Sequence, residues 1–164
     1  MDNKFLCVLA GYDDEKEKYI ARLQDNLYKK GFVGTQTKDI PMHITMGTFD
    51  TRQEKQLIEK LEEVAATTSP FDVNLSHIGI FSGGKVLFVT PDINRELLNL
   101  KEQFGDSANW TAHTTLLIDQ PENIQSALAD VVENFVQTKA KIYLLHLFEF
   151  WPTIHITKVK FKGL

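Results

Sequence analysis

The chain has 164 residues, of which 43% are hydrophobic and 24% are charged, which is typical of a globular protein and excludes a disordered one. Its formal net charge of -4 means that the surface as a whole is not basic, so any contact with nucleic acid would need a local basic patch. A single cysteine, Cys7, excludes an intramolecular disulfide and a zinc site built from cysteines. The apolar run around Cys7 is too short to span a membrane and lacks the layout of a signal peptide, so we expect a cytoplasmic protein without a membrane partner.

Apolar runs typical of strands alternate along the chain with amphipathic stretches typical of helices. Strands are predicted at 4–12, 40–49, 71–81, 85–91, 110–119, 141–152 and 153–163, and helices at 13–31, 51–65, 93–105 and 121–139.

The order of these elements repeats in the two halves of the chain. Each half begins with a strand, a helix, a second strand and a second helix, followed by further strands. We therefore predict one domain over residues 1–164 that contains two repeats, at about 4–81 and 85–162. The predicted fold is α+β and bilobal, with a pseudo-twofold internal repeat, two mainly antiparallel sheets each backed by two helices, and a central cleft.

A His-x-Thr pattern stands in the second strand of each repeat. His43 and Thr45 lie in "MHITMG", and His113 and Thr115 lie in "AHTTLL". Alternate residues of a strand share a face, so each strand carries an imidazole and a hydroxyl on one face and mostly apolar residues on the other. The twofold repeat would bring the two polar faces together across the cleft.

A third copy, His155 in "TIHITKV", occupies no repeat position. The same alternation puts Lys158 and the lysines after it on the opposite face from His155, as in a solvated edge strand. We interpret His155 as structural, and His77 and His146, in apolar strands, as core histidines.

Two facing histidines suit acid–base catalysis, because one neutral imidazole accepts a proton while one imidazolium donates one. Neighbouring threonine hydroxyls are able to donate hydrogen bonds to phosphate oxygens. The alternative is that each histidine is a strand residue whose ring is hydrogen-bonded locally. The equivalent positions of the two histidines in the repeats make this alternative weaker.

These motifs resemble the paired His-x-Thr motifs of the 2H phosphoesterase superfamily, which includes RNA 2',3'-cyclic phosphodiesterases, also called 2'-5' RNA ligases. The stretch "LSHIGIFSGGKVLFVTP" is similar to the central hairpin of that family. The resemblance implies His43 and His113 as the catalytic pair and Thr45 and Thr115 as phosphate ligands. The one departure is Thr114, which stands where the family usually has an apolar residue.

The resemblance implies an enzyme that needs no cofactor and no metal, and we separately expect a monomer. It would hydrolyse a 2',3'-cyclic phosphate on an RNA end or a small nucleotide to a 2'-phosphate, with His113 as base and His43 as acid. The reverse reaction would be 2'-5' ligation. The alternatives are a non-catalytic nucleotide- or RNA-binding module with the same cleft and, less well supported, a histidine metal site.

Other candidate contacts flank the "SGG" turn and the end of a late strand. Phe81 is a candidate for stacking on a base, and Lys85 for approaching a phosphate. Their alternatives are a core aromatic residue and a solvated lysine. The aromatic residues Phe148, Phe150 and Trp151 either border a nucleobase pocket or pack in the core.

Overall fold

The structure, a computed structural model, describes residues 3–35 and 38–163 and contains the predicted strands and helices in the predicted order. The strands are β1 (Phe5–Tyr12), β2 (His43–Asp50), β3 (Phe71–Ile80), β4 (Val86–Pro91), β5 (Thr114–Ile118), β6 (Thr138–Phe150) and β7 (Ile154–Lys160). The helices are α1 (Asp14–Lys29), the 3-10 turn η1 (Thr51–Gln53), α2 (Glu54–Thr67), α3 (Arg95–Glu102) and α4 (Pro121–Asn134).

The strands form one continuous antiparallel sheet rather than the two separate sheets that the sequence predicts. The strand order is β2-β1-β6-β3-β4-β5, and β7 pairs with β6. Strands β1, β2 and β3 of the first repeat correspond to β4, β5 and β6 of the second. When each strand is replaced by its counterpart, the same order is obtained, read from the other end. The strand order therefore has the twofold symmetry expected of a repeated unit.

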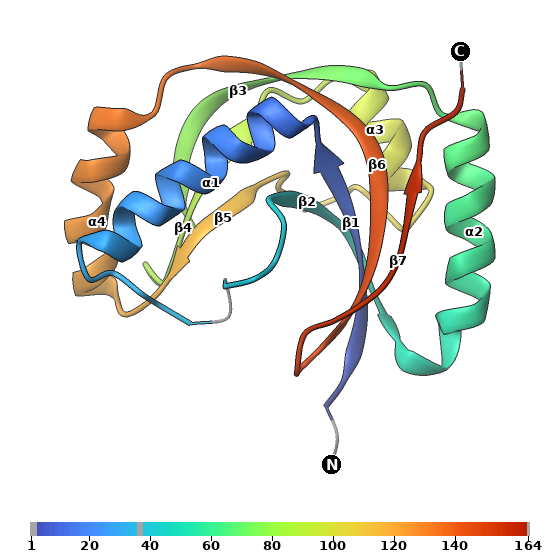
Figure 1. Cartoon of the computed structure of the whole chain (residues 1–164), viewed down its shortest axis with the longest axis horizontal. Coiled ribbons are helices and arrows are strands. Elements are labelled where there is room, and N and C mark those ends of the chain that lie inside the picture. The colour runs from blue at the N-terminus through green and yellow to red at the C-terminus, as the bar shows by residue number, and fades with distance from the viewer. Residues whose placement is uncertain (1–2, 36–37, 164) are drawn as a thin grey trace.

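The long strand β6 joins the two halves of the sheet. Its residues 142–150 pair with β1 along one edge, while on the other edge 138–142 pair with β3 and 144–149 pair with β7. One half of the sheet thus contains β2, β1, β6 and β7, and the other contains β6, β3, β4 and β5. Figure 1 shows the sheet curving between these two halves.

Two helices back each half of the sheet, and each pair combines helices from both halves of the chain. Helix α1 packs against α4 and β5, whereas α2 packs against β6 and β7 and α3 packs against β2. Figure 1 accordingly shows α1 and α4 on one flank and α2 and α3 on the other. Pairing helices by their order along the chain would have grouped α1 with α2.

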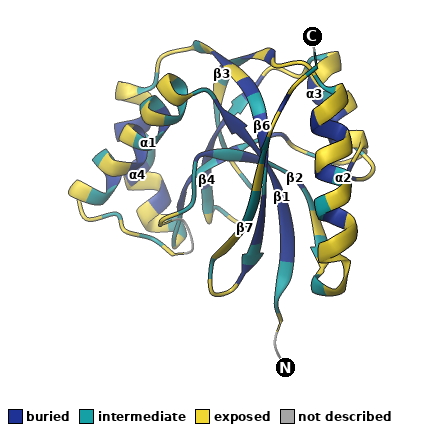
Figure 2. Ribbon diagram, turned by 45° about the vertical axis from the view of Figure 1, so that its right-hand side comes forward, coloured by how far each residue is buried: buried dark blue, intermediate teal, exposed yellow. Residues whose placement is uncertain are grey.

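The main core lies between the helices and one face of the sheet. It includes Ile20 of α1, Leu61 of α2, Leu97 of α3 and Ile124 of α4, all at most 1% exposed. Figure 2 shows each helix buried on the side that faces the sheet and exposed on the outer side. The other face of the sheet is left for the cleft. Among the described residues, none of the helices has the length and apolar character needed to cross a bilayer.

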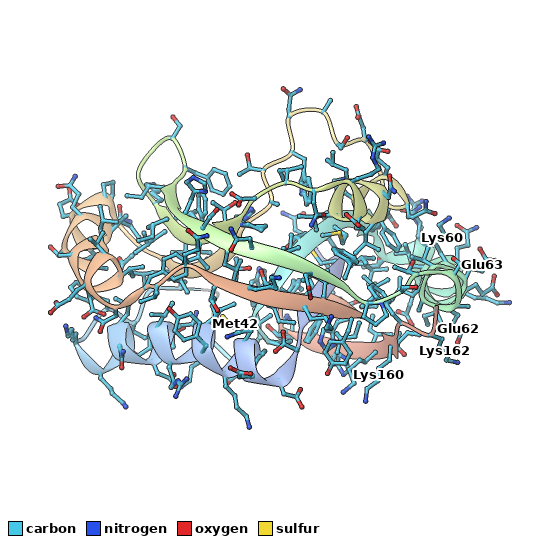
Figure 3. The ribbon with its side chains drawn as sticks, turned by 90° about the horizontal axis from the view of Figure 1, so that it is seen from above. Met42, Lys60, Glu62, Glu63, Lys160 and Lys162 are labelled. Atoms are coloured by element: carbon cyan, nitrogen blue, oxygen red, sulfur yellow. The ribbon has the colours of Figure 1, made fainter. Side chains whose placement is uncertain are left out.

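A β-bulge in β7 corrects the face predicted for His155. His155 pairs with Phe148 and Lys158 pairs with His146, with a register shift between these pairs. The extra residue reverses the alternation, so His155 and Lys158 share the face of His146 instead of lying on opposite faces. In Figure 3, Lys160 and Lys162 lie beside α2, well away from Met42, the residue before His43.

Candidate active site

The two predicted catalytic histidines begin the two outermost strands of the main strand path. His43 is the first residue of β2, and His113 directly precedes β5. Each histidine and its threonine, Thr45 or Thr115, is half-buried on the cleft side. The alternate residues point into the core and are at most 1% exposed, namely Ile44, Met46, Ala112, Thr114 and Leu116.

Both imidazole rings are held by the same local hydrogen bond. His43 Nδ1 lies 2.6 Å from the carbonyl oxygen of Pro41, and His113 Nδ1 lies 2.8 Å from that of Thr111. A carbonyl oxygen only accepts, so Nδ1 carries the hydrogen in both rings. This leaves Nε2 of each ring as the nitrogen that gains or releases a proton. The chain thus presents the same tautomer at two symmetry-related positions.

Burial makes both histidines weak bases in the free protein. It lowers the pKa of His43 from 6.5 to about 4; the hydrogen bond to Pro41 opposes this, and nearby His113 adds to it. Burial also lowers the pKa of His113, again opposed by the bond to its backbone acceptor, Thr111. The influence of His113 on His43 means that the two rings interact. Both are therefore neutral at pH 7 until an anion arrives.

A cavity of about 200 Å³ adjoins His43 and is lined by Thr45 and Thr115 together with apolar side chains. It therefore has a polar side from β2 and β5 and an apolar side from β1, β6 and the chain before β2. The apolar side comprises Phe5, Cys7, Leu9, Ile40, Phe150 and Trp151. The predicted aromatic cluster divides accordingly: Phe150 and Trp151 border the cavity, and Phe148 packs in the small core beneath it with Cys7 and Leu9.

The two residues predicted beside the "SGG" turn lie in different surroundings. Phe81 is half-buried, and its ring centroid lies 4.7 Å from that of His113 and 4.6 Å from that of Phe88. The fold thus brings Phe81 against a candidate catalytic ring. Lys85 is exposed and is not among the residues that line the cavity.

The buried residue Thr114 takes part in a contact that strand alternation does not reveal. Its Oγ1 donates to the carbonyl oxygen of His43 at 2.8 Å and lies 2.6 Å from Tyr12 Oη. The sequence did indicate that position 114 is unusual, because a threonine stands where the family motif usually has an apolar residue. Alternation alone indicated only that Thr114 faces the core.

A second histidine pair lies on the cleft side of β6 and β7. His146 Nδ1 and His155 Nε2 are 3.3 Å apart, and Phe148 packs against both rings. Burial lowers the pKa of His146 to about 4, with further lowering from His155, Lys158 and His43. His146 therefore lies at the cleft edge near His43 and not in the main core. Within residues 3–35 and 38–163, no three histidine, cysteine or carboxylate side chains gather closely enough to hold a metal ion.

Comparison with known proteins gives one family and one fold. The family model described as "2'-5' RNA ligase superfamily" matches residues 12–150. A search of curated protein sequences found no significant relative. E. coli LigT in its apo form aligns at 13% identity with a TM-score of 0.65, over 96% of each chain.

Two other solved structures align over nearly their whole length. A crystal structure described only as a phosphoesterase aligns at 13% identity with a TM-score of 0.69, covering 98% of this chain and 99% of the other. TT0787 of Thermus thermophilus aligns at 13% identity with a TM-score of 0.65, covering 97% of this chain and 98% of the other. At such identities these alignments establish a shared fold, including its mixed order of strands and helices.

Proposed function

This chain belongs to the 2'-5' RNA ligase superfamily, and from that premise we propose that it hydrolyses 2',3'-cyclic phosphates to 2'-phosphates. The observation that supports this best is the matched pair His43 and His113, each with Nδ1 tied to the carbonyl two residues earlier. Two imidazoles with the same available nitrogen suit a reaction that needs one base and one acid. Opening a cyclic phosphate with water is such a reaction.

In the proposed step, a base histidine takes a proton from water, and the water oxygen attacks the phosphorus. The bond from phosphorus to the ribose 3'-oxygen breaks, and the acid histidine gives its proton to that oxygen. The product keeps the phosphate on the 2'-oxygen. We propose His113 as the base, since it is the more exposed ring and meets solvent more readily, and His43 as the acid.

Thr45 and Thr115 are proposed to bind the phosphate. Both line the cavity beside His43, one from each of the two outer strands. Hydroxyls donate to the non-bridging oxygens and stabilise the charge that builds on them during attack. A phosphate held by both threonines would lie beside His43, which lines the same cavity, and it is proposed to reach His113, which directly precedes the strand of Thr115.

The apolar side of the cavity is proposed to hold the nucleoside. Phe150 and Trp151 offer aromatic faces, and Phe5 and Ile40 add apolar surface at the cavity wall. Bases bind on such surfaces by stacking. LigT has been crystallised with 3'-AMP, with NADP+ and with ATP, and this likeness in fold supports a nucleotide in the cleft. Phe81, which packs on His113, is proposed to border the substrate on the other side.

The substrate is proposed to be an RNA end or a small nucleotide, acted on by a cytoplasmic monomer. The reverse reaction, in which a 2'-5' bond is formed, uses the same two histidines with their roles exchanged, by microscopic reversibility. The cavity is small, about 200 Å³, so we propose that it holds only the end of the substrate and that any further RNA lies outside it.

The test is a hydrolysis assay, with a chelator present, on a panel of 2',3'-cyclic nucleotides and cyclic-ended RNA, in which the product is identified as 2'- or 3'-phosphate. We expect turnover to a 2'-phosphate, and a loss of about 10²- to 10⁴-fold in His43→Ala and in His113→Ala. His77→Ala is the matched control, because His77, which the sequence predicts in the core, is exposed and does not line the cavity. Full activity in either cleft variant would refute the proposal.

A non-catalytic binding module is the competing function. It would appear in the same experiment as tight binding of 2'-nucleotides without turnover on any member of the panel.

A further inference from the structure

One buried hydroxyl joins the two histidine segments directly. Thr114 follows His113 in the chain, and its Oγ1 is 2.8 Å from the carbonyl oxygen of His43 on the opposite strand. The hydroxyl has a single hydrogen, and the carbonyl only accepts, so that hydrogen points to His43. Tyr12 Oη, 2.6 Å from Thr114 Oγ1, must then be the donor to it. The result is a chain of hydrogen bonds from Tyr12 through Thr114 to the backbone of His43.

A second side chain from the same segment makes a parallel contact. Trp110 Nε1 donates to the carbonyl oxygen of Thr45 at 3.2 Å. β2 lies at one end of the main strand path and β5 at the other, so no backbone ladder joins them. The carbonyls of His43 and Thr45 are therefore linked to the His113 segment by its side chains and not by strand pairing with β5.

We propose that Tyr12, Thr114 and Trp110 are positioning residues that set the separation of His43 and His113, and we call these three residues the edge clamp. The inference rests on the proposed function for its effect on rate, although the contacts exist whatever the substrate is. The clamp residues do not touch the reacting atoms. They act by fixing the backbone from which each histidine side chain extends.

Two of the three clamp residues, Tyr12 and Thr114, are buried. Tyr12 is 2% exposed and Thr114 is 1% exposed, so neither hydroxyl has water as an alternative partner. Burial also raises the pKa of Tyr12, which keeps the phenol protonated and therefore a donor. A valine at 114 would keep the volume but leave both the Tyr12 hydroxyl and the His43 carbonyl without this partner.

A small change in this contact should lower the reaction rate, because catalysis by two histidines depends on their exact separation. A two-histidine reaction needs both Nε2 atoms within hydrogen-bond reach of one substrate at the same time. A displacement of about 1 Å in such a site is able to cost about 10²-fold in rate. The clamp spans the contact between the two histidine segments, so its loss should alter their separation.

The first test compares Thr114→Val with Thr114→Ser in the cyclic phosphate assay. We expect kcat to fall by about 10- to 100-fold in Thr114→Val with KM nearly unchanged, and to stay within about threefold of the wild type in Thr114→Ser. Tyr19→Phe is the matched control for loss of a tyrosine hydroxyl bond, since Tyr19 Oη bonds the backbone of Val136 away from the cleft. Equal kcat in Thr114→Val and Thr114→Ser would overturn the proposal.

The second test does not need turnover. The imidazole ¹⁵N resonances of His43 and His113 are recorded in each variant by NMR, with Trp110→Phe and Tyr12→Phe as further variants in case Thr114→Val does not fold. We expect the resonances of both histidines to shift in every clamp variant and in neither Thr114→Ser nor Tyr19→Phe. Unchanged resonances overturn the clamp. A wild-type protein without activity on cyclic phosphates, but with these shifts, refutes the proposed function alone.

Discussion

His43 combines burial that disfavours its charged form with a proposed role, that of the acid, which needs a charge. The lowering of its pKa from 6.5 to about 4 corresponds to about 3 kcal/mol in favour of the neutral ring. A phosphate charge about 4 Å away is worth about 4 kcal/mol at an effective dielectric constant near 20. The two terms are of similar size and opposite sign. The bound substrate is thus able to restore the proton that the free protein disfavours.

This balance predicts different responses of the two histidines to the leaving group. In a 3'-deoxynucleoside 2'-(4-nitrophenyl phosphate), the leaving group occupies the place of the ribose 3'-oxygen and departs without protonation. We expect His43→Ala to lose less than about tenfold on this ester but about 10²- to 10⁴-fold on the cyclic phosphate. Steady-state rates of both variants on both substrates measure it.

His113→Ala serves as the internal control, because a base is needed for both substrates. The reverse pattern, with His113→Ala rescued by the activated ester, would exchange the acid and the base while leaving the two-histidine mechanism in place.

At the scale of elements, the loop between α1 and β2 is fastened to β5. Thr35 N donates to the carbonyl oxygen of Ile118 at 2.9 Å, and Ile118 also lines the cavity. Gly34 precedes this contact with a φ of +63°, and a Cβ there would lie 2.6 Å from that same carbonyl oxygen. Only glycine allows the loop to approach β5 this closely.

We predict that Gly34→Ala lowers the free energy of unfolding by about 2 kcal/mol or more, because left-handed strain adds to a clash with backbone. It should also reduce activity by shifting Ile118. The control is Gly31→Ala in the same loop, where φ is +91° but no atom lies within 4 Å of the added Cβ. Urea unfolding of both variants tests this, and equal losses would show that the clash does not matter.

Element boundaries in the second half of the chain depart from the predicted ones for local reasons. The helix predicted at 93–105 begins at Arg95, because Asn94 Oδ1 accepts from Leu97 N at 2.9 Å and caps it. The helix predicted to 139 ends at Asn134, since the residues from Thr138 onward join the sheet as β6. Helix α4 is therefore shorter than its sequence pattern predicts, because the residues that follow pair with distant strands of the sheet.

At the scale of the whole molecule, buried neutral histidines link stability to pH. The pKa of His43 is about 4 in the folded protein and near 6.5 in an unfolded chain, so the unfolded state binds more protons between these values. Stability is therefore lost as pH falls from about 6.5 to 4. His146, whose pKa is also lowered to about 4, acts in the same direction.

We predict that His43 alone contributes a loss of about 2–3 kcal/mol in unfolding free energy between pH 7.5 and pH 4.5. His43→Gln, which stays neutral, should remove that part of the pH dependence. Urea titrations at the two pH values give the comparison. The same slope in wild type and His43→Gln would mean that His43 is not buried as a neutral ring.

The sequence by itself determined the features that depend on local periodicity. The order of strands and helices, the faces of His43, Thr45, His113 and Thr115, and the repeated pattern around them all follow from hydrophobic spacing within a few residues. The tertiary structure decided what depends on partners far along the chain. It joined the predicted two sheets through β6, exchanged the helices between the halves, and reversed the face of His155 by a bulge.

Thr114 marks the boundary between these two kinds of information. Its burial followed from strand alternation, but its hydrogen bonds depend on Tyr12 and His43, which lie 102 and 71 positions away in the chain. Hydrophobic periodicity predicts which face of a strand a residue occupies, but it does not predict which atoms of distant residues its side chain will contact. Pairing across the cleft is set by the packing of the whole sheet, and only the tertiary structure contains it.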